Sequence, residues 1–282
     1  MAGVAAGAVQ KTNPATVQEE PLLVLDDIHL RFGGLNALSG VSFAVKQGHI
    51  QAIIGPNGAG KTCILNCICR FYHPYRGKIV FGGQDISHIS THRVAGLGIA
   101  RSFQNIELFR GMTVLDNIKL GHHVHMNSGF LSGGLYLGKA QREELAVRKE
   151  IEERIIDLLE IEAIRKQVVG TLPYGLQKRV ELARALAMKP KILLLDEPMA
   201  GMNLEETEDM ARFILDVNDE WGVTVVLIEH DMGVVMDISD NVVVLDFGTK
   251  IAQGTPREVS KNPHVIEAYL GSEAAAHSKL GL

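Results

Sequence analysis

Eight consecutive residues of this chain have the composition of a loop that binds phosphates. They fit the pattern G-x-x-x-x-G-K-[ST], and they are Gly55, Pro56, Asn57, Gly58, Ala59, Gly60, Lys61 and Thr62. The glycines let successive backbone N–H groups face a phosphate at a helix N-terminus. The lysine then reaches the β and γ oxygens, and the threonine hydroxyl can ligate Mg²⁺. The chemistry predicted here is binding of a nucleotide polyphosphate with Mg²⁺.

A pair of carboxylates supplies a second kind of chemistry. Asp196 ends the apolar run Ile192 to Leu195, so we expect it at the carboxyl edge of a sheet, where ligands of open α/β sheets bind. There Asp196 can hold Mg²⁺ directly or through water, while Glu197 is placed to polarise an attacking water as a general base. A surface Asp-Glu turn would look the same in isolation, and the complete phosphate loop favours the catalytic interpretation.

Two further side chains are candidates for the same edge. His230 follows the apolar run Val223 to Ile228 and is expected near the γ-phosphate. Gln104 precedes a helical region and could offer its side-chain oxygen to Mg²⁺ or to the attacking water. A histidine after a strand is more often structural, and a glutamine alone is uninformative, so both depend on the surrounding motifs.

Apolar periodicity locates the elements that must position these groups. An antiparallel ribbon is predicted over Leu22 to Leu30 and Val41 to Val45, with a further strand over Lys78 to Phe81. A short strand over Ile50 to Ile54 runs into the glycine loop, and a helix from Lys61 to Arg70 follows it. This strand, loop and helix form the context that a phosphate loop requires.

Later in the chain, short apolar runs alternate with helices. These runs are Ile192 to Leu195, Val223 to Ile228 and Val242 to Leu245, and buried parallel strands have this composition. Helices are predicted over Leu204 to Trp221 and, with dense charge, over Gln141 to Leu159. The expected fold class is α/β, with helices on both faces of a mostly parallel sheet, a helical subdomain and an antiparallel edge.

One folded unit with two tails is the expected domain organisation. Residues 1–20 are rich in small side chains and lack the basic start and Leu/Ile-rich core of a secretory signal, so a flexible N-terminal tail is predicted. A nucleotide-binding domain is expected over 21–271, with a helical subdomain inserted at about 105–190, and a C-terminal tail over 272–282. Within the insertion, residues 127–134 are predicted to form a Gly/Ser-rich loop.

Composition argues against several functions. The net charge of the 282-residue chain is -5, so a nucleic-acid partner is not expected. No run approaches the roughly 18 apolar residues of a spanning helix, and a membrane role must therefore come through a partner. Buried thiols are favoured over a zinc site for Cys63, Cys67 and Cys69, since no fourth ligand is near. A polar loop is favoured over a metal site for His122, His123 and His125.

Taken in order, five motifs resemble the nucleotide-binding subunits of ABC transporters over about Pro21 to Gly271: GPNGAGKT, the Gln104 loop, LPYGLQKR, ILLLDEP and IEHD. The resemblance implies a P-loop NTPase with a RecA-like core that hydrolyses ATP. It also implies a head-to-tail pair of subunits, in which each ATP lies between one phosphate loop and the partner's signature motif. The implied signature is Leu172, Pro173, Tyr174, Gly175, Leu176 and Gln177.

The same resemblance assigns further contacts. Phe32 looks like the aromatic residue that stacks on adenine, and Cys63 continues the phosphate loop in place of the usual Thr or Ser. A loop that crosses the dimer interface is implied at Ala200, Gly201, Met202 and Asn203. The run Arg31 to Leu35, the run Gly98 to Asn105 and the long insertion are most similar to the ATPases of branched-chain amino-acid uptake systems.

Such importers pair two ATPase chains with two integral membrane permease subunits and an extracytoplasmic solute-binding protein. The resemblance thus implies a peripheral subunit at the cytoplasmic face of the inner (plasma) membrane, and cargo that includes branched-chain amino acids, amides or urea. The alternative is a soluble ABC-type ATPase that acts as an ATP-dependent clamp without a membrane partner. Gln104 followed by helices favours transport, because membrane subunits dock on that subdomain in the family.

Two residues of the signature depart from the family pattern. Pro173 stands where the family usually has Ser, so a hydroxyl that would bind the partner's γ-phosphate is lost, and Leu176 replaces the usual Gln. Proline suits the first helical position, and Gly175 can still offer its backbone N–H. One hypothesis is a heterodimer with unequal sites, in which this signature completes the weaker one. The other is that the helix N-terminus suffices.

Overall fold

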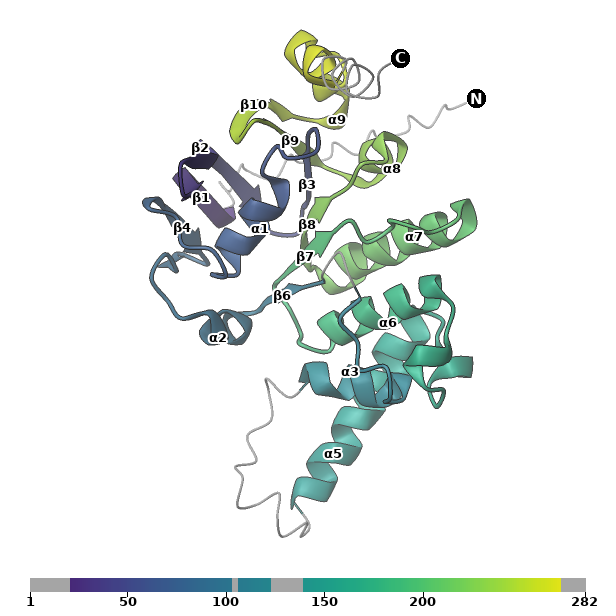
Figure 1. Ribbon diagram of the computed structural model, residues 1–282. Coiled ribbons are helices and arrows are strands. Elements are labelled where there is room, and N and C mark those ends of the chain that lie inside the picture. The colour runs from purple at the N-terminus through teal and green to yellow at the C-terminus, as the bar shows by residue number, and fades with distance from the viewer. Residues whose placement is uncertain (1–20, 103–105, 123–138, 270–282) are drawn as a thin grey trace, which may run out of the picture.

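Two sheets lie side by side in the computed structural model, which describes residues 21–102, 106–122 and 139–269 (Figure 1). The first sheet is antiparallel, in the order β2-β1-β4-β5. Its strands are β1 (Pro21–Phe32), β2 (Leu35–Lys46), β4 (Arg76–Phe81) and β5 (Gln84–Asp85). The predicted antiparallel ribbon is confirmed, and both of its strands are longer than the apolar pattern indicated.

The second sheet carries the candidate site. Its order is β10-β9-β3-β8-β7-β6, and all of its neighbours are parallel except β9 and β10. Its strands are β3 (Ile50–Ile54), β6 (Ile99–Arg101), β7 (Ile192–Asp196), β8 (Thr224–Ile228), β9 (Asn241–Asp246) and β10 (Thr249–Gly254). β3, β7 and β8 are buried throughout, as expected for parallel strands covered on both faces.

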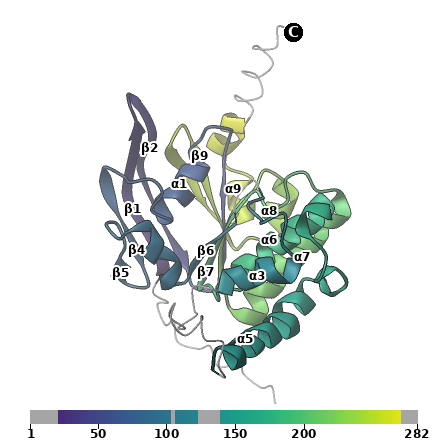
Figure 2. The ribbon, with the colours of Figure 1, turned by 60° about the horizontal axis from the view of Figure 1, so that its bottom comes forward.

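Successive residues of each central strand pack into different cores. Leu193 and Val225 face α6 and α7, whereas Leu194 and Val226 face α1 and the antiparallel sheet. A third cluster joins β3 and β9 to α8 and α9. Figure 2 shows α1 between the two sheets. These helices are α1 (Lys61–Ile68), α6 (Tyr174–Leu186), α7 (Leu204–Trp221), α8 (Met232–Ile238) and α9 (Pro256–Val259).

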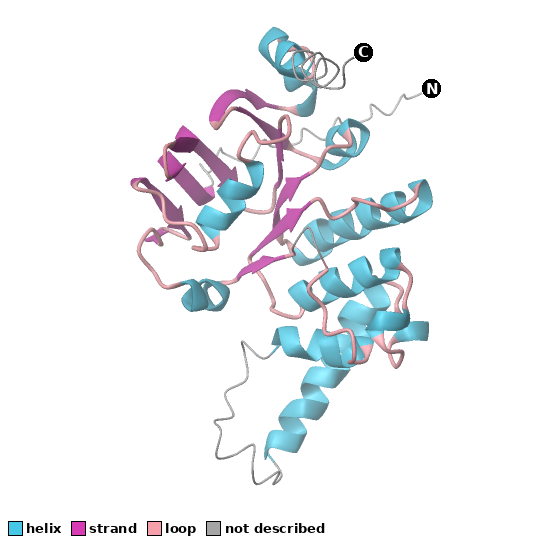
Figure 3. Ribbon diagram, viewed as in Figure 1, coloured by secondary structure: helices cyan, strands magenta, loops and turns pink. Residues whose placement is uncertain are grey.

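The helices of the predicted insertion gather below the sheets in the view of Figure 3. α3 (Val114–His122) packs on α6, and α5 (Lys139–Glu150) continues into the π-helix η3 (Ile151–Ile156). The amphipathic helix expected over Gln141 to Leu159 is therefore helical but not uniformly α. Shorter helical segments are α2 (Thr91–Val94), η1 (Ala95–Leu97), η4 (Glu162–Ile164) and η5 (Val169–Thr171).

Some of the predicted segments lie outside the described residues, and one predicted helix ends earlier than expected. The tails 1–20 and 272–282, the loop 127–134, Gln104, His123 and His125 lie outside the described residues. Within the described ranges, none of the helices combines the length and the apolar content that crossing a membrane requires. The helix predicted to reach Arg70 ends at Ile68, since Arg70 adopts a left-handed backbone with φ 61°.

Candidate nucleotide-binding site

The glycine loop joins β3 to α1 and is fixed by the strands packed around it. Gly60 has φ +98°, and a Cβ there would lie 2.8 Å from Ala37 O and 2.9 Å from Leu38 Cδ2, both on β2. Gly248, in the turn between β9 and β10, donates its N–H to Ala59 O over 3.1 Å. The loop therefore needs glycine at position 60 for its conformation and for space.

Lys61 is folded back into this loop. Its Nζ donates to Gly55 O over 2.7 Å and to Pro56 O over 3.1 Å. Burial lowers the pKa of Lys61, an effect that the charges of Glu197 and Asp196 oppose. The ammonium group thus lies at the mouth of the loop, bonded to carbonyl oxygens that phosphate oxygens can replace.

Thr62 and Asp196 meet where the sequence predicts a Mg²⁺ site. The Thr62 hydroxyl donates to Asp196 Oδ1 over 3.3 Å, and Asp196 ends β7 with only 1% of its surface exposed. Hard oxygen ligands about 2.1 Å from an octahedral Mg²⁺ lie roughly 3 Å from each other. The two oxygens therefore fit a Mg²⁺ ion.

Arg101 is a further residue of this centre that the sequence analysis missed. It ends β6, and its guanidinium donates from Nη2 to Asp196 Oδ2 over 2.8 Å and from Nη1 to Asn66 Oδ1 over 2.6 Å. Its side chain is 6% exposed. The available signal was an arginine directly after the short apolar run Gly98 to Ala100. In the parallel pairing of β6 with β7, Arg101 lies opposite Leu194, two residues before Asp196.

Glu197 and His230 lie together at the carboxyl edge of the sheet, where both were expected, and the structure shows that they are in contact. Because β7 pairs with β8, Asp196 lies opposite Ile228, and the Glu197 N–H donates to Ile228 O over 2.9 Å. His230 Nε2 lies 2.6 Å from Glu197 Oε1. Glu197 has φ 51°, a left-handed conformation that is uncommon outside glycine and that concentrates at functional sites.

Glu229 is the second residue that the sequence analysis missed. Its carboxylate is buried and accepts the Met199 N–H and the His230 N–H, each over 3.0 Å. Burial raises the pKa of Glu229 above its ordinary value, while these two N–H bonds act in the opposite direction. Glu229 thereby joins the turn after Glu197 to the turn that carries His230. An acidic residue directly before the histidine was the available signal.

The predicted signature forms the start of α6. Pro173 caps this helix, and Tyr174 is the first helical residue, so the proline lies one position earlier than predicted. Pro173 has no side-chain hydrogen bond that caps the helix. Gln177 Nε2 donates to Leu172 O over 2.8 Å at the same end of the helix. Leu176 packs against the core of the helical region.

The predicted dimer loop packs against the signature of the same chain. A Cβ on Gly175 would collide with the Glu206 carboxylate, and a Cβ on Gly201 would lie 3.3 Å from the Tyr174 ring. Asn203 begins α7, and its side chain accepts the Glu206 N–H over 3.0 Å in a capping box. Gly201 and Asn203 are exposed, whereas Ala200 and Met202 are half-buried.

The remaining predicted nucleotide contacts lie beside the loop. Phe32 ends β1 with 47% of its surface exposed, and its ring forms a T-shaped pair with the Tyr72 ring at a centroid distance of 5.0 Å. Cys63 is half-buried, and burial raises its pKa. Cys67 and Cys69 are buried free thiols, and burial raises their pKa values to about 12 and about 11. Within the described ranges, no group of three or more His, Cys, Asp or Glu side chains that could hold a metal ion is present.

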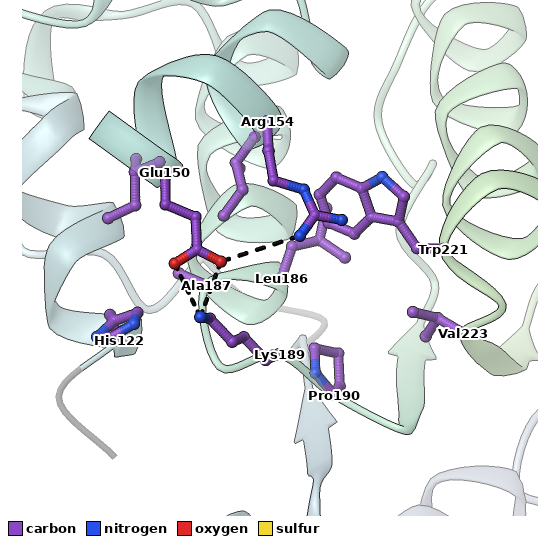
Figure 4. Close-up of a pocket in the computed structure, with 11 residues that line it drawn as sticks. His122, Glu150, Arg154, Leu186, Ala187, Lys189, Pro190, Trp221 and Val223 are labelled. Carbon is purple, nitrogen blue, oxygen red and sulfur yellow. Dashed lines mark hydrogen bonds and ion pairs between the residues drawn. The ribbon is translucent and has the colours of Figure 1, made fainter. Parts of the chain in front are cut away.

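A pocket of about 180 Å³ lies at the opposite edge of the sheet, between the helical region and the amino ends of β7 and β8 (Figure 4). Glu150 binds Lys189 over 2.8 Å and contacts Arg154 at 3.9 Å. The Arg154 guanidinium lies 5.0 Å from the centroid of the Trp221 ring. His122 lines this pocket and is remote from the predicted nucleotide contacts. We therefore assign these side chains to the joint between helices and not to nucleotide chemistry.

A phosphate loop, a buried carboxylate after one strand and a histidine after the next, with a helical region attached, define an ATP-binding cassette. The chain matches the family model described as ABC transporter over residues 38–200. It also matches, over residues 249–275, a model described as branched-chain amino acid ATP-binding cassette transporter. The chain belongs to the ABC transporter family of ATPases.

Named relatives share most of its length. The chain is 42% identical over 251 residues to the high-affinity branched-chain amino acid transport ATP-binding protein BraF of Pseudomonas aeruginosa, covering 89% of this chain and 98% of the relative. It is 41% identical over 255 residues to LivG of Escherichia coli strain K12, with the same coverage. The ADP conformation of an ATP-binding cassette of an ABC transporter superposes with a TM-score of 0.77 at 31% identity, covering 89% of this chain and 99% of that structure.

Two glycines of the phosphate loop should differ in their tolerance of a side chain. Gly60→Ala places a Cβ against β2 and should weaken ATP binding at least about tenfold, whereas Gly58→Ala meets open space and only the cost of its positive φ, about 1 kcal/mol. Titration of each purified variant with ATP checks this expectation. Equal affinities would show that packing against β2 does not shape the loop.

Proposed function

We propose that this chain binds and hydrolyses ATP as a subunit of an importer for branched-chain amino acids or related small polar solutes such as amides or urea. The observation that carries the proposal is the meeting of Thr62 with Asp196 and of Glu197 with His230 at one sheet edge. The names of the relatives support branched-chain amino acids as the cargo. The nucleotide-binding domain is proposed to span 21–271, with its helical subdomain at about 105–190.

Each residue of the site has a separable role in this proposal. Phe32 stacks on adenine, the loop amides and Lys61 bind the phosphates, and Asp196, Thr62 and Gln104 hold Mg²⁺. When bound, Mg²⁺ would neutralise charge on the phosphate oxygens. Glu197 accepts the proton of an attacking water, and His230, 2.6 Å away, orients the Glu197 carboxylate.

Exchange of the general base separates binding from turnover. Glu197→Gln should bind ATP with near-normal affinity and hydrolyse it about 10²- to 10⁴-fold more slowly, because the amide cannot accept the proton. Single-turnover hydrolysis and nucleotide titration together measure the two effects. Glu208→Gln, an exposed change on α7, is the matched control. Near-normal turnover in Glu197→Gln would remove Glu197 from the role of base.

The ATP sites are proposed to form between two ATPase subunits, in a homodimer or a heterodimer. The signature, Leu172 to Gln177, and the loop Ala200 to Asn203 would both face the partner. The close approach of Gly201 to the Tyr174 ring supports this, because a Cβ on Gly201 would lie 3.3 Å from that ring and the two segments thus share one surface. Pro173 brings no hydroxyl to that surface, which favours a heterodimer with unequal sites over a symmetric pair.

Restoring the hydroxyl tests this asymmetry. Pro173→Ser should raise the ATPase rate of the isolated chain severalfold, since a serine at the helix cap can both bond the helix amides and reach the partner's γ-phosphate. Steady-state hydrolysis against protein concentration measures the effect. An unmodified homodimer that hydrolyses ATP as fast as the assembled transporter would instead support the hypothesis that the helix N-terminus suffices.

An apolar groove of about 360 Å³ supports docking on membrane subunits. It lies between the phosphate-loop side and the helical region, and its exposed apolar side chains are Phe71, Phe109 and Leu120. We propose that each of two permease subunits inserts one short segment into the groove of one ATPase subunit. The chain would then lie peripherally on the cytoplasmic face of the inner membrane, and an extracytoplasmic solute-binding protein would act through the permeases.

Purification from solubilised membranes distinguishes this proposal from a soluble clamp. The chain should co-purify with permease-like proteins, and Phe109→Ser should reduce their recovery at least about tenfold by removing an anchor of the groove. Phe247→Ser is the matched control, because Phe247 is 88% exposed and does not line the groove. Elution of the unmodified chain from the cytosol without permease-like proteins would reject the transport function and favour the clamp.

A further inference from the structure

Arg101 connects three elements of the proposed metal site. It ends β6, one guanidinium nitrogen donates to Asn66 on α1, and another donates to Asp196 at the end of β7. The Arg101 and Asp196 side chains are 6% and 1% exposed. A planar guanidinium with two fixed partners holds its orientation in a way that a lysine cannot.

The two oxygens of the Asp196 carboxylate have different partners. Oδ2 accepts from Arg101 over 2.8 Å, and Oδ1 accepts from the Thr62 hydroxyl over 3.3 Å. The arginine therefore does not occupy the oxygen that faces Thr62. Arg101 fixes the rotation of the Asp196 carboxylate, so that Oδ1 stays on the side of Thr62, the other predicted metal ligand.

We infer that Arg101 is a positioning residue for Mg²⁺, acting through Asp196. This inference rests on the proposed function, in which Asp196 and Thr62 hold the metal. Residues that orient a metal ligand typically contribute 10- to 100-fold in metal affinity. Nothing in the motifs of the phosphate loop or of the Asp196 strand requires an arginine on β6, so its effect is separable from theirs.

The same side chain reaches a second surface. Arg101 lines the apolar groove together with Phe71 and Phe109. Ser102, the next residue, donates its N–H to Leu194 O over 2.9 Å, so the pairing of β6 with β7 continues past the arginine. A segment bound in the groove would thus touch the residue that holds the metal carboxylate.

Metal binding by the full-length chain tests the inference without turnover. With a non-hydrolysable ATP analogue bound, Mn²⁺ affinity measured by electron paramagnetic resonance should fall about 10- to 100-fold in Arg101→Met. Affinity for the analogue in EDTA should stay unchanged. Arg101→Lys should recover only part of the loss, because one ammonium cannot reproduce both directed bonds. Arg212→Met, which removes an exposed arginine that also bridges two carboxylates, should leave Mn²⁺ affinity unchanged.

Unchanged or tighter Mn²⁺ binding in Arg101→Met would overturn the inference. Asp196→Asn distinguishes its failure from failure of the proposed function. Loss of Mn²⁺ binding in Asp196→Asn but not in Arg101→Met removes only the role of Arg101, whereas unchanged binding in both removes the metal role of Asp196. If Arg101→Met does not fold, Asn66→Ala replaces it: weaker Mn²⁺ binding supports the inference, and unchanged binding overturns it.

Discussion

Burial of the Asp196 carboxylate is the constraint on which the rest of the site depends. An ionised group with 1% exposure must be paired and hydrogen-bonded, since an isolated buried charge costs several kcal/mol. The neighbouring elements meet this need from two sides, with Arg101 from β6 and Thr62 from α1. The strand order β8-β7-β6 therefore also places charges. It puts Arg101, the cation that pairs with Asp196, on one side of β7, and the Glu197–His230 pair on the side of β8.

The turn after Asp196 has an unfavourable backbone conformation that hydrogen bonds from neighbouring residues stabilise. Glu197 takes a left-handed backbone, at a cost of order 1–3 kcal/mol. Its N–H bond to Ile228 O and the Glu229 carboxylate, which joins Met199 to His230, fix that turn from β8. The backbone therefore turns away from the direction of β7 at Glu197, and the Glu197 side chain contacts His230. The conformation of one residue thus depends on the sheet pairing of two strands.

Several strands and helices were predictable because their positions depend on local composition. Ile50 to Ile54 and Leu204 to Trp221 were predicted to the residue, since apolar runs and capping signals specify such elements directly. Arg101 and Glu229 were not predicted, because their roles depend on which strands become neighbours, and composition does not state sheet order. The π-helix Ile151–Ile156 was missed for a related reason: α- and π-helices give similar apolar patterns over so short a span.

The signature shows how local chemistry and packing can diverge. Pro173 brings no hydroxyl, yet the start of α6 is bonded by Gln177 from within the helix and packs against Gly201, in the loop that follows β7, and Glu206, in the first turn of α7. Because those contacts do not involve the missing hydroxyl, the surface offered to a partner keeps its shape while it loses one donor. In the proposed dimer, a loss of that kind would weaken binding of the partner's γ-phosphate without disturbing this chain's own phosphate loop. The proposed inequality of the two ATP sites therefore rests on a single side chain, Pro173, at the start of an otherwise well-packed helix.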